Sequence, residues 1–168
     1  ASWHNTRDGM AALGGWLTGV AGSLGKMGED LSLLTQSGIN EVTLSSGGSS
    51  STMPQKANPV LPAVLVANAR TTVGTNAALQ SALPHRQERD GAAWLTEWQN
   101  LPQLVLLTAR SLAIAEDLTQ ALAPNPEAMT RHIDSTGGMI FAEALSFALS
   151  EILPRPEAQV AVKAMVAE

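Results

Sequence analysis

The feature that most constrains this chain is a run of apolar residues near its start, spaced alternately by three and four positions. Its members are Met10, Leu13, Leu17, Val20, Leu24, Met27, Leu31 and Leu34. This spacing places all of their side chains along one seam of an α-helix that packs against other helices. We therefore predict one long helix of a helical bundle in this part of the chain.

Glycines flank this seam on several sides, namely Gly14, Gly15, Gly19, Gly22, Gly25 and Gly28. Each interior glycine costs a helix roughly 1 kcal/mol relative to alanine. An isolated surface helix would not tolerate so many, but close approach of neighbouring helices can offset the cost. The pattern predicts a helix that is buried nearly all round, deep in a multi-helix assembly.

Two more long helices are predicted, over residues 60–83 and 92–122. Arg70 is the only charge in the first, which we therefore expect to be buried. The second has a three-four seam of its own, made of Leu104, Leu107, Ser111, Ile114, Leu118 and Ala121. Aromatic residues make up only 4% of the chain, so its core is filled by aliphatic side chains, which suits packed helices better than sheets.

Shorter helices are predicted after Pro124, over residues 126–135 and 139–152, and a last one opens at Pro156. The predicted fold is all-α, with long antiparallel helices of a central bundle followed by short helices of a C-terminal helical domain. We place the bundle in residues 1–123 and the start of an incomplete second domain in residues 124–168.

Composition excludes several classes of function. The net charge of −5 argues against a nucleic-acid binder, which needs clustered Lys and Arg. There are no cysteines, so disulfides and thiolate metal sites are excluded. The uncharged stretch 9–25 is too short and too rich in Gly, Ser and Thr to span a membrane. The first residues lack the pattern of a signal peptide, and we expect a cytoplasmic protein.

The segment 37–58 differs from its surroundings because it is rich in serine and glycine. Composition alone would indicate a flexible linker. Long loops between helices are, however, often functional. Residues 50–59, which read Ser-Ser-Thr-Met-Pro-Gln-Lys-Ala-Asn-Pro, favour function over the linker interpretation.

This segment closely resembles the signature loop of the fumarase/aspartase superfamily, Gly-Ser-Ser-x-Met-Pro-x-Lys-x-Asn-Pro. Ser49 stands where that pattern has Gly. Ala57 stands where related cycloisomerases and adenylosuccinate lyases usually carry Arg, so this chain lacks a cation at that position. Residues 3–8, 88–102 and 136–144 resemble the muconate cycloisomerase branch of the superfamily, in the same order and at matching spacing.

The resemblance implies lactonisation of 3-carboxy-cis,cis-muconate in aromatic degradation, with no metal or organic cofactor. Sulfo- and chloro-muconates stay open as substrates. It also implies a homotetramer whose active sites combine regions of three subunits, so this chain alone is not expected to hold a complete site. An adenylosuccinate lyase is the alternative within the superfamily, although the run Trp-x-x-Glu-Trp at 94–98 argues against it. A non-catalytic helical assembly protein is the alternative of another class.

The chemistry of the superfamily forms or breaks a bond at the carbon β to a carboxylate, through a dianionic aci-carboxylate. Such an intermediate requires fixed donors and positive charge. By resemblance, Ser50 is the general base in elimination and the acid in lactonisation, while Lys56 and Asn58 bind the substrate carboxylate and the developing charge. The other substrate-binding candidates are Ser51, Thr52, Met53 and Arg7.

Three further side chains are interpreted from their local sequence alone. His85 follows Pro84 in a polar connection and is interpreted as a solvated loop histidine. Trp94 and Trp98 are four residues apart, so they share one helix face and are expected to pack.

Overall fold

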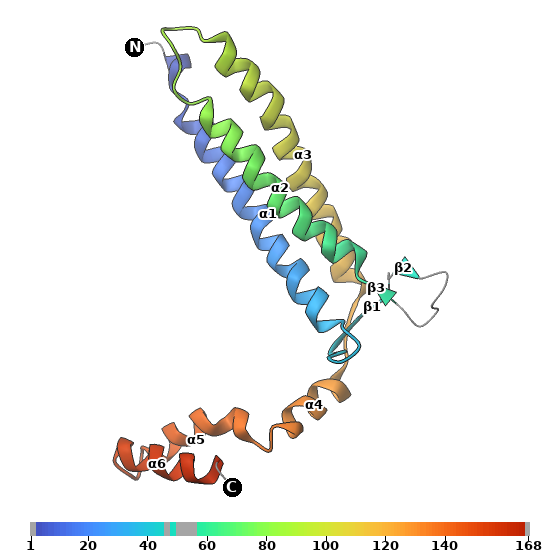
Figure 1. Cartoon of the computed structure of the whole chain (residues 1–168), viewed down its shortest axis with the longest axis vertical. Helices are drawn as coiled ribbons and strands as arrows, with labels where there is room; N and C mark the ends of the chain where they lie inside the picture. Colours follow the sequence, from blue (N-terminus) through green and yellow to red (C-terminus); the bar gives the residue numbers. More distant parts are fainter. Residues whose placement is uncertain (1–2, 46–47, 50–56, 167–168) are drawn as a thin grey trace. The chain divides into compact units, whose positions relative to one another are not determined.

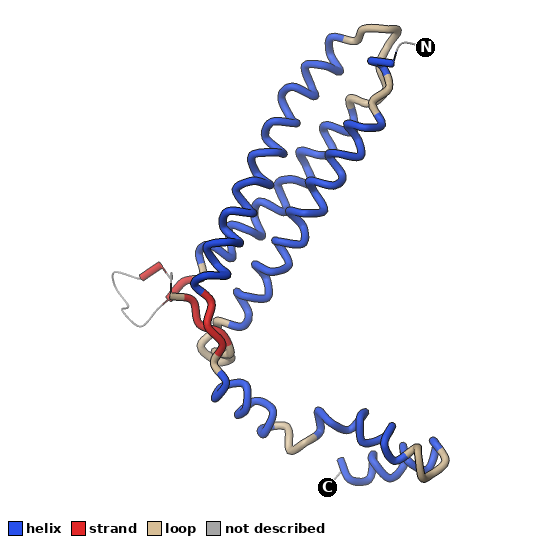
Figure 2. Tube along the Cα trace, turned by 180° about the vertical axis from the view of Figure 1, so that it is seen from behind, coloured by secondary structure: helices blue, strands red, loops and turns tan. Residues whose placement is uncertain are grey.

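The computed structural model describes residues 3–45, 48–49 and 57–166. The chain divides into two compact units, Ala1–Pro124 and Asn125–Glu168. The described residues are mostly helical, which confirms the all-α prediction (Figure 2).

Three long helices form the body of the first unit. They are α1 (Asp8–Leu34), α2 (Val60–Ser81) and α3 (Gly91–Ala121), and a short 3₁₀ turn, η1 (Trp3–Asn5), precedes α1. Consecutive helices run in opposite directions and lie side by side along their length (Figure 1). Their observed limits differ from the predicted ones by no more than a few residues.

Glycines on α1 set its distance from α2. A Cβ added to Gly28 would lie 2.5 Å from the backbone oxygen of Pro62, and one added to Gly25 would lie 2.5 Å from the Cβ of Ala69. Neither position has room for a side chain. The two backbones approach each other so closely because these residues have none.

Only part of the predicted seam on α1 is buried within one chain. Leu17 and Leu31 are buried, together with Gly14, Ala21, Gly25 and Gly28. Leu13 is exposed, Trp16 is 65% exposed, and Gly15, Gly19 and Gly22 face open space. Within a single chain α2 and α3 cover only one face of α1, so burial of its other faces in a larger assembly stays a prediction.

The predicted seam of α3 is confirmed. Its buried residues include Leu104, Ser111, Ile114 and Leu118. Leu104 meets Leu17 of α1 and Leu79 of α2 in a buried cluster that joins all three helices. An aliphatic core with almost no aromatic residues is the result expected from the composition.

Polar side chains connect the helices at three levels. Gln80 Nε2 donates to the backbone oxygen of Ala11 at 3.1 Å, and Asn68 Nδ2 donates to Ser111 Oγ at 3.2 Å. Thr108 Oγ1 lies 3.4 Å from the oxygen of Leu17. Because a hydrogen bond needs specific geometry, these bonds fix the relative register of helices whose apolar contacts alone would allow sliding.

Two short strand pairs lie near the ends of α1 and α3, although no strand was predicted. β1 (Val42–Leu44) pairs antiparallel with β4 (Leu122–Pro124). β2 (Gly48–Ser49) pairs antiparallel with β3 (Ala57–Asn58). Strands of two or three residues are too short to show an alternating pattern, so periodicity could not indicate them.

The second unit contains α4 (Pro126–Ser135), a 3₁₀ turn η2 (Met139–Phe141), α5 (Ala142–Leu149) and α6 (Arg155–Val166). Asn125 caps α4, its side chain accepting from the backbone N–H of Ala128 at 3.3 Å. The single helix predicted over 139–152 is wrong at both ends. It starts as a 3₁₀ turn after two left-handed glycines, and it ends at Leu149.

None of the helices in the described ranges combines the length and the apolar character that crossing a membrane would require.

A matched pair of substitutions tests the close packing of α1 on α2. Gly28→Ala would overpack the contact at a cost of about 1–3 kcal/mol, more than the roughly 1 kcal/mol that alanine gains in helix propensity. Gly22→Ala meets no neighbouring atom within 4 Å and keeps only that gain. In thermal unfolding of this chain we expect Gly28→Ala to melt earlier and Gly22→Ala to melt later than the native sequence. Equal melting temperatures for the two variants would contradict the packing.

Candidate functional site

Most of the residues predicted from the signature loop lie outside the described residues, namely Ser50, Ser51, Thr52, Met53 and Lys56. The residues on either side of them are described. Gly48 pairs with Asn58, and Ser49 pairs with Ala57, so the two ends of the segment are held together by a two-residue ladder.

Asn58 is half-buried and directly precedes Pro59, the N-cap residue of α2. It lines a small pocket of about 130 Å³ with residues of β1 and the end of α1, among them Thr35, Thr43 and Leu44. The predicted start of this helix at residue 60 is correct, because α2 begins at Val60. The paired strands and the helix start together fix the position of Asn58.

Arg7 lies at the opposite end of the bundle, as the N-cap residue of α1. A helix the length of α1, 27 residues, spans about 40 Å. The start of α2 lies beside the end of α1 in space (Figure 1). Asn58 and Arg7 are therefore separated by roughly the length of α1 within one chain. The structure does not bring these two predicted residues together.

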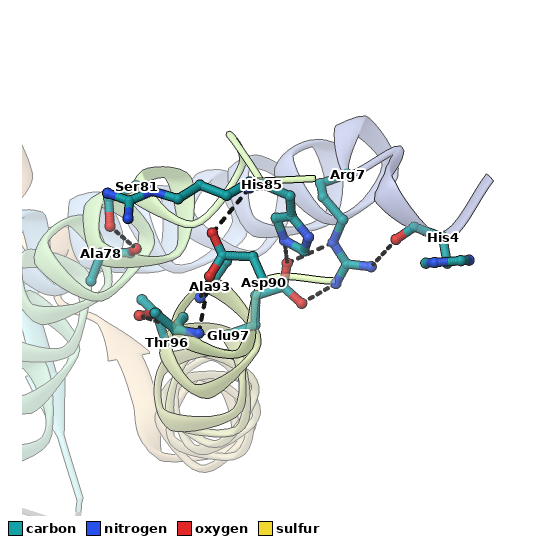
Figure 3. A network of polar contacts seen from close by, with 11 residues as sticks. His4, Arg7, Ala78, Ser81, His85, Asp90, Ala93, Thr96 and Glu97 are labelled. Atoms are coloured by element: carbon teal, nitrogen blue, oxygen red, sulfur yellow. Dashed lines mark hydrogen bonds and ion pairs between the residues drawn. The ribbon is translucent and has the colours of Figure 1, made fainter. Parts of the chain in front are cut away.

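The Arg7 guanidinium instead binds the carboxylate of Glu97 on α3. Its Nε donates to Glu97 Oε1 at 2.6 Å, and its Nη2 binds Glu97 Oε2. The two side chains are 18% and 4% exposed. A bidentate pair with so little solvent around it is a strong, geometrically defined link between the starts of α1 and α3 (Figure 3).

His85 belongs to the same buried cluster. Its side chain is 2% exposed, and its Nε2 lies 3.8 Å from Glu97 Oε1. Neither ring nitrogen has a hydrogen-bond partner in the described part of the chain. The interpretation of His85 as a solvated loop histidine is therefore wrong. The connection between α2 and α3 lies against η1 and places the His85 ring beside Glu97, which no local sequence signal indicated.

The residues of η1 hold this connection in place. His4 Nε2 lies 3.0 Å from the backbone oxygen of Glu88, and Asn5 Nδ2 donates to the backbone oxygen of Gln87 at 2.8 Å. Gln87 has a left-handed backbone with φ of 54°, which is unfavourable for a residue other than glycine. The two hydrogen bonds help to hold that conformation.

Asp90 closes the connection and caps α3. Its carboxylate accepts from the backbone N–H of Arg86 at 3.0 Å, and from those of Ala92 at 3.0 Å and Ala93 at 3.2 Å. The N–H of Arg86 has the largest effect, and together with the N–H groups of Ala93 and Ala92 it holds the pKa of Asp90 below its ordinary value. The ionised form is therefore the one that stabilises the cap.

A shallow pocket of about 290 Å³ opens beside the ion pair. Its lining comes from η1, α1 and α3 and consists of His4, Arg7, Trp94, Glu97 and Trp98. The rings of Trp94 and Trp98 stack at a centroid distance of 6.5 Å with planes 20° apart, which confirms the predicted packing. Trp98 is nevertheless 67% exposed. The pocket therefore combines a cation with flat aromatic walls.

Glu97 is the functional candidate that we did not predict from the sequence. A usable signal was present, since Glu97 follows Ala93 by four positions and precedes Leu104 by seven, so it falls on the buried stripe of α3. A lone carboxylate on such a stripe requires a cationic partner.

No cluster of three or more residues able to hold a metal ion occurs among the described residues.

The chain is similar in sequence to known lyases and cycloisomerases. Residues 2–74 match the sequence model of a family described as Lyase. A 3-carboxy-cis,cis-muconate cycloisomerase of Pseudomonas aeruginosa is 42% identical over 159 residues, which cover 93% of this chain and 35% of the relative. The chain belongs to the fumarase/aspartase superfamily.

A solved structure within the superfamily agrees with this assignment. The 3-carboxy-cis,cis-muconate lactonizing enzyme of Pseudomonas putida superposes with a TM-score of 0.85 at 37% identity, covering 98% of this chain and 38% of that one. A nitrosuccinate lyase of Streptomyces davaonensis is 34% identical over 161 residues, 94% of this chain and 34% of the relative. The chain therefore spans about a third of the length of the superfamily members that it matches.

The Arg7–Glu97 pair makes a clear prediction for stability. Glu97→Ala leaves the guanidinium largely buried without its counterion, and breaking such a pair costs about 3–5 kcal/mol. The double variant Arg7→Met/Glu97→Met removes both charges, so we expect it to regain most of that loss. Urea unfolding of the native chain and both variants measures the difference. A double variant as unstable as Glu97→Ala would contradict a role based on charge pairing.

Asp90 makes a prediction for pH. A carboxyl group whose pKa is lowered on folding stabilises the fold above its unfolded pKa, and this contribution is lost as the pH falls through the folded pKa. Asp90→Asn can still accept hydrogen bonds but does not titrate. We expect the native chain to melt above Asp90→Asn at pH 6 and the gap to narrow as the pH falls below the ordinary aspartate pKa of about 3.9. A gap independent of pH would show that the charge of Asp90 is unimportant.

Proposed function

We propose that the full-length protein carrying this segment is a cycloisomerase that lactonises 3-carboxy-cis,cis-muconate in aromatic degradation. The observation that supports this most is the match of residues 50–59 to the signature loop of the superfamily, together with the name of the 42% identical relative. The proposed enzyme works without a metal or an organic cofactor.

In this proposal Ser50 donates the proton in the lactonising direction and removes it in the reverse direction. Lys56 and Asn58 hold the substrate carboxylate and the charge that develops on it, which is where fixed donors lower the barrier most. Ser51, Thr52 and Met53 line the pocket, and Arg7 contacts a substrate carboxylate. The pairing of Gly48 with Asn58 supports the arrangement, because it ties the start of the segment to a substrate-binding candidate.

We propose that the working form is a cytoplasmic homotetramer. Arg7 and Asn58 lie at opposite ends of the bundle, so a site that uses both requires at least two copies. Antiparallel association of copies would bring the Arg7 end of one beside the Asn58 end of another. Trp16 and the open glycine face of α1 offer an uncovered surface for such contacts.

The name of the relative from Streptomyces davaonensis supports a second candidate, a lyase that eliminates a group β to a carboxylate from a succinate-like substrate. Ala57 supplies no cation to contact the substrate, so this position favours neither substrate over the other. An ultraviolet assay that offers 3-carboxy-cis,cis-muconate and nitrosuccinate in parallel separates the two candidates. Turnover of nitrosuccinate alone would replace the cycloisomerase proposal.

Ser50→Ala tests the catalytic role. General acid–base catalysis contributes about 10²–10⁴-fold. In the full-length protein we therefore expect Ser50→Ala to lower kcat for muconate loss by that range and to leave the melting temperature unchanged. Ser45→Ala, outside the motif, is the matched control and should keep native turnover. We expect the isolated 168-residue chain to show little or no turnover. Native kcat in Ser50→Ala would remove Ser50 from the mechanism.

A further inference from the structure

The donor groups of Arg7 are only partly used. A guanidinium carries five N–H donors. Within the described part of the chain, Nε and Nη2 bind Glu97, and Nη1 donates to the backbone oxygen of His4 at 3.4 Å. One N–H therefore remains on each Nη. These two form the end-on edge of the guanidinium, because Glu97 occupies the side edge shared by Nε and Nη2.

This free edge is held rigidly. Glu97 is 4% exposed and fixed on α3, and the two bonds that it accepts define the plane of the guanidinium. The buried ring of His85 lies against the same carboxylate (Figure 3). An arginine preorganised in this way loses little conformational freedom when it binds a ligand.

The surroundings of Arg7 specify what the edge can bind. The pocket beside it is walled by the stacked rings of Trp94 and Trp98 and holds about 290 Å³. Two parallel N–H donors match the two oxygens of a carboxylate. The aromatic walls suit a flat, unsaturated carbon skeleton attached to it.

We propose that Arg7, Trp94 and Trp98 form a subsite for the carboxylate of a planar unsaturated acid, with Glu97 as the residue that positions the guanidinium. The inference rests on the proposed substrate-binding role of Arg7 and names the ligand class, the donors and the positioning residue. Since Glu97 already neutralises Arg7, the hydrogen bonds are directional but the net attraction is small. Binding to this end of the bundle alone is therefore weak, in the millimolar range.

Benzoate and benzamide are suitable probes because they have nearly the same shape and differ in charge. We expect benzoate, added to the 168-residue chain, to shift the NMR signals of the Arg7 Nε–H and the indole N–H of Trp94, with benzamide shifting neither. Arg7→Lys keeps the charge but lacks the two parallel N–H donors of the guanidinium, so benzoate should bind this variant at least tenfold more weakly. Arg7→Met/Glu97→Met replaces that variant if it does not fold.

Glu97→Gln gives the result that a purely structural role would not produce. It removes the counter-charge while leaving one oxygen to hold the guanidinium, so benzoate should bind several-fold more tightly. Equal binding of benzoate and benzamide, unchanged binding to Arg7→Lys, or no tightening in Glu97→Gln would each overturn the subsite. So would shifts confined to the indole of Trp16, on the far surface of α1.

The experiment also separates this inference from the proposed reaction, because it measures binding and not turnover. Loss of turnover in Ser50→Ala, combined with no benzoate binding at Arg7, would overturn the subsite alone. Benzoate binding at Arg7, combined with native turnover in Ser50→Ala, would overturn the role of Ser50 alone.

Discussion

The contact between α1 and α2 determines much of the rest of the structure. Gly25 and Gly28 let α1 approach α2 closely, because Gly28 lies against the backbone oxygen of Pro62 and Gly25 against the Cβ of Ala69. At that separation Leu17, Leu79 and Leu104 close into one cluster, and Gln80 reaches the backbone of Ala11. A wider spacing would open cavities in the aliphatic core and break this bond. The pairing of Arg7 with Glu97 across α1 and α3 depends on how these helices pack.

The bundle also keeps two polar ends apart. One end carries the ion pair of Arg7 and Glu97 with His85 beside it, and the other carries Asn58 between a strand pair and the start of α2. Long helices packed along their length do not bend to bring such groups together. A site that combines them would therefore need parts of more than one chain.

The ion pair shows how a structural contact can also prepare a binding group. A lone arginine at the start of a helix would be mobile and solvated. Glu97 fixes its plane and leaves two of its donors unused, beside a pocket with aromatic walls. The same carboxylate reduces the net charge, so recognition there depends on geometry more than on long-range attraction. Stability and ligand recognition consequently depend on the same pair of residues.

Sequence alone determined the helices, because three-four spacing of apolar residues records the pitch of an α-helix directly. It also indicated the superfamily, because residues 50–59 closely resemble its signature loop. Only the tertiary structure decided that Glu97 faces Arg7, 90 positions away in the chain, and that the connection after α2 buries His85. It also decided which glycines of α1 touch α2 and which face open space. These outcomes depend on how separate helices rotate and align against one another, and a local pattern contains no information about that rotation.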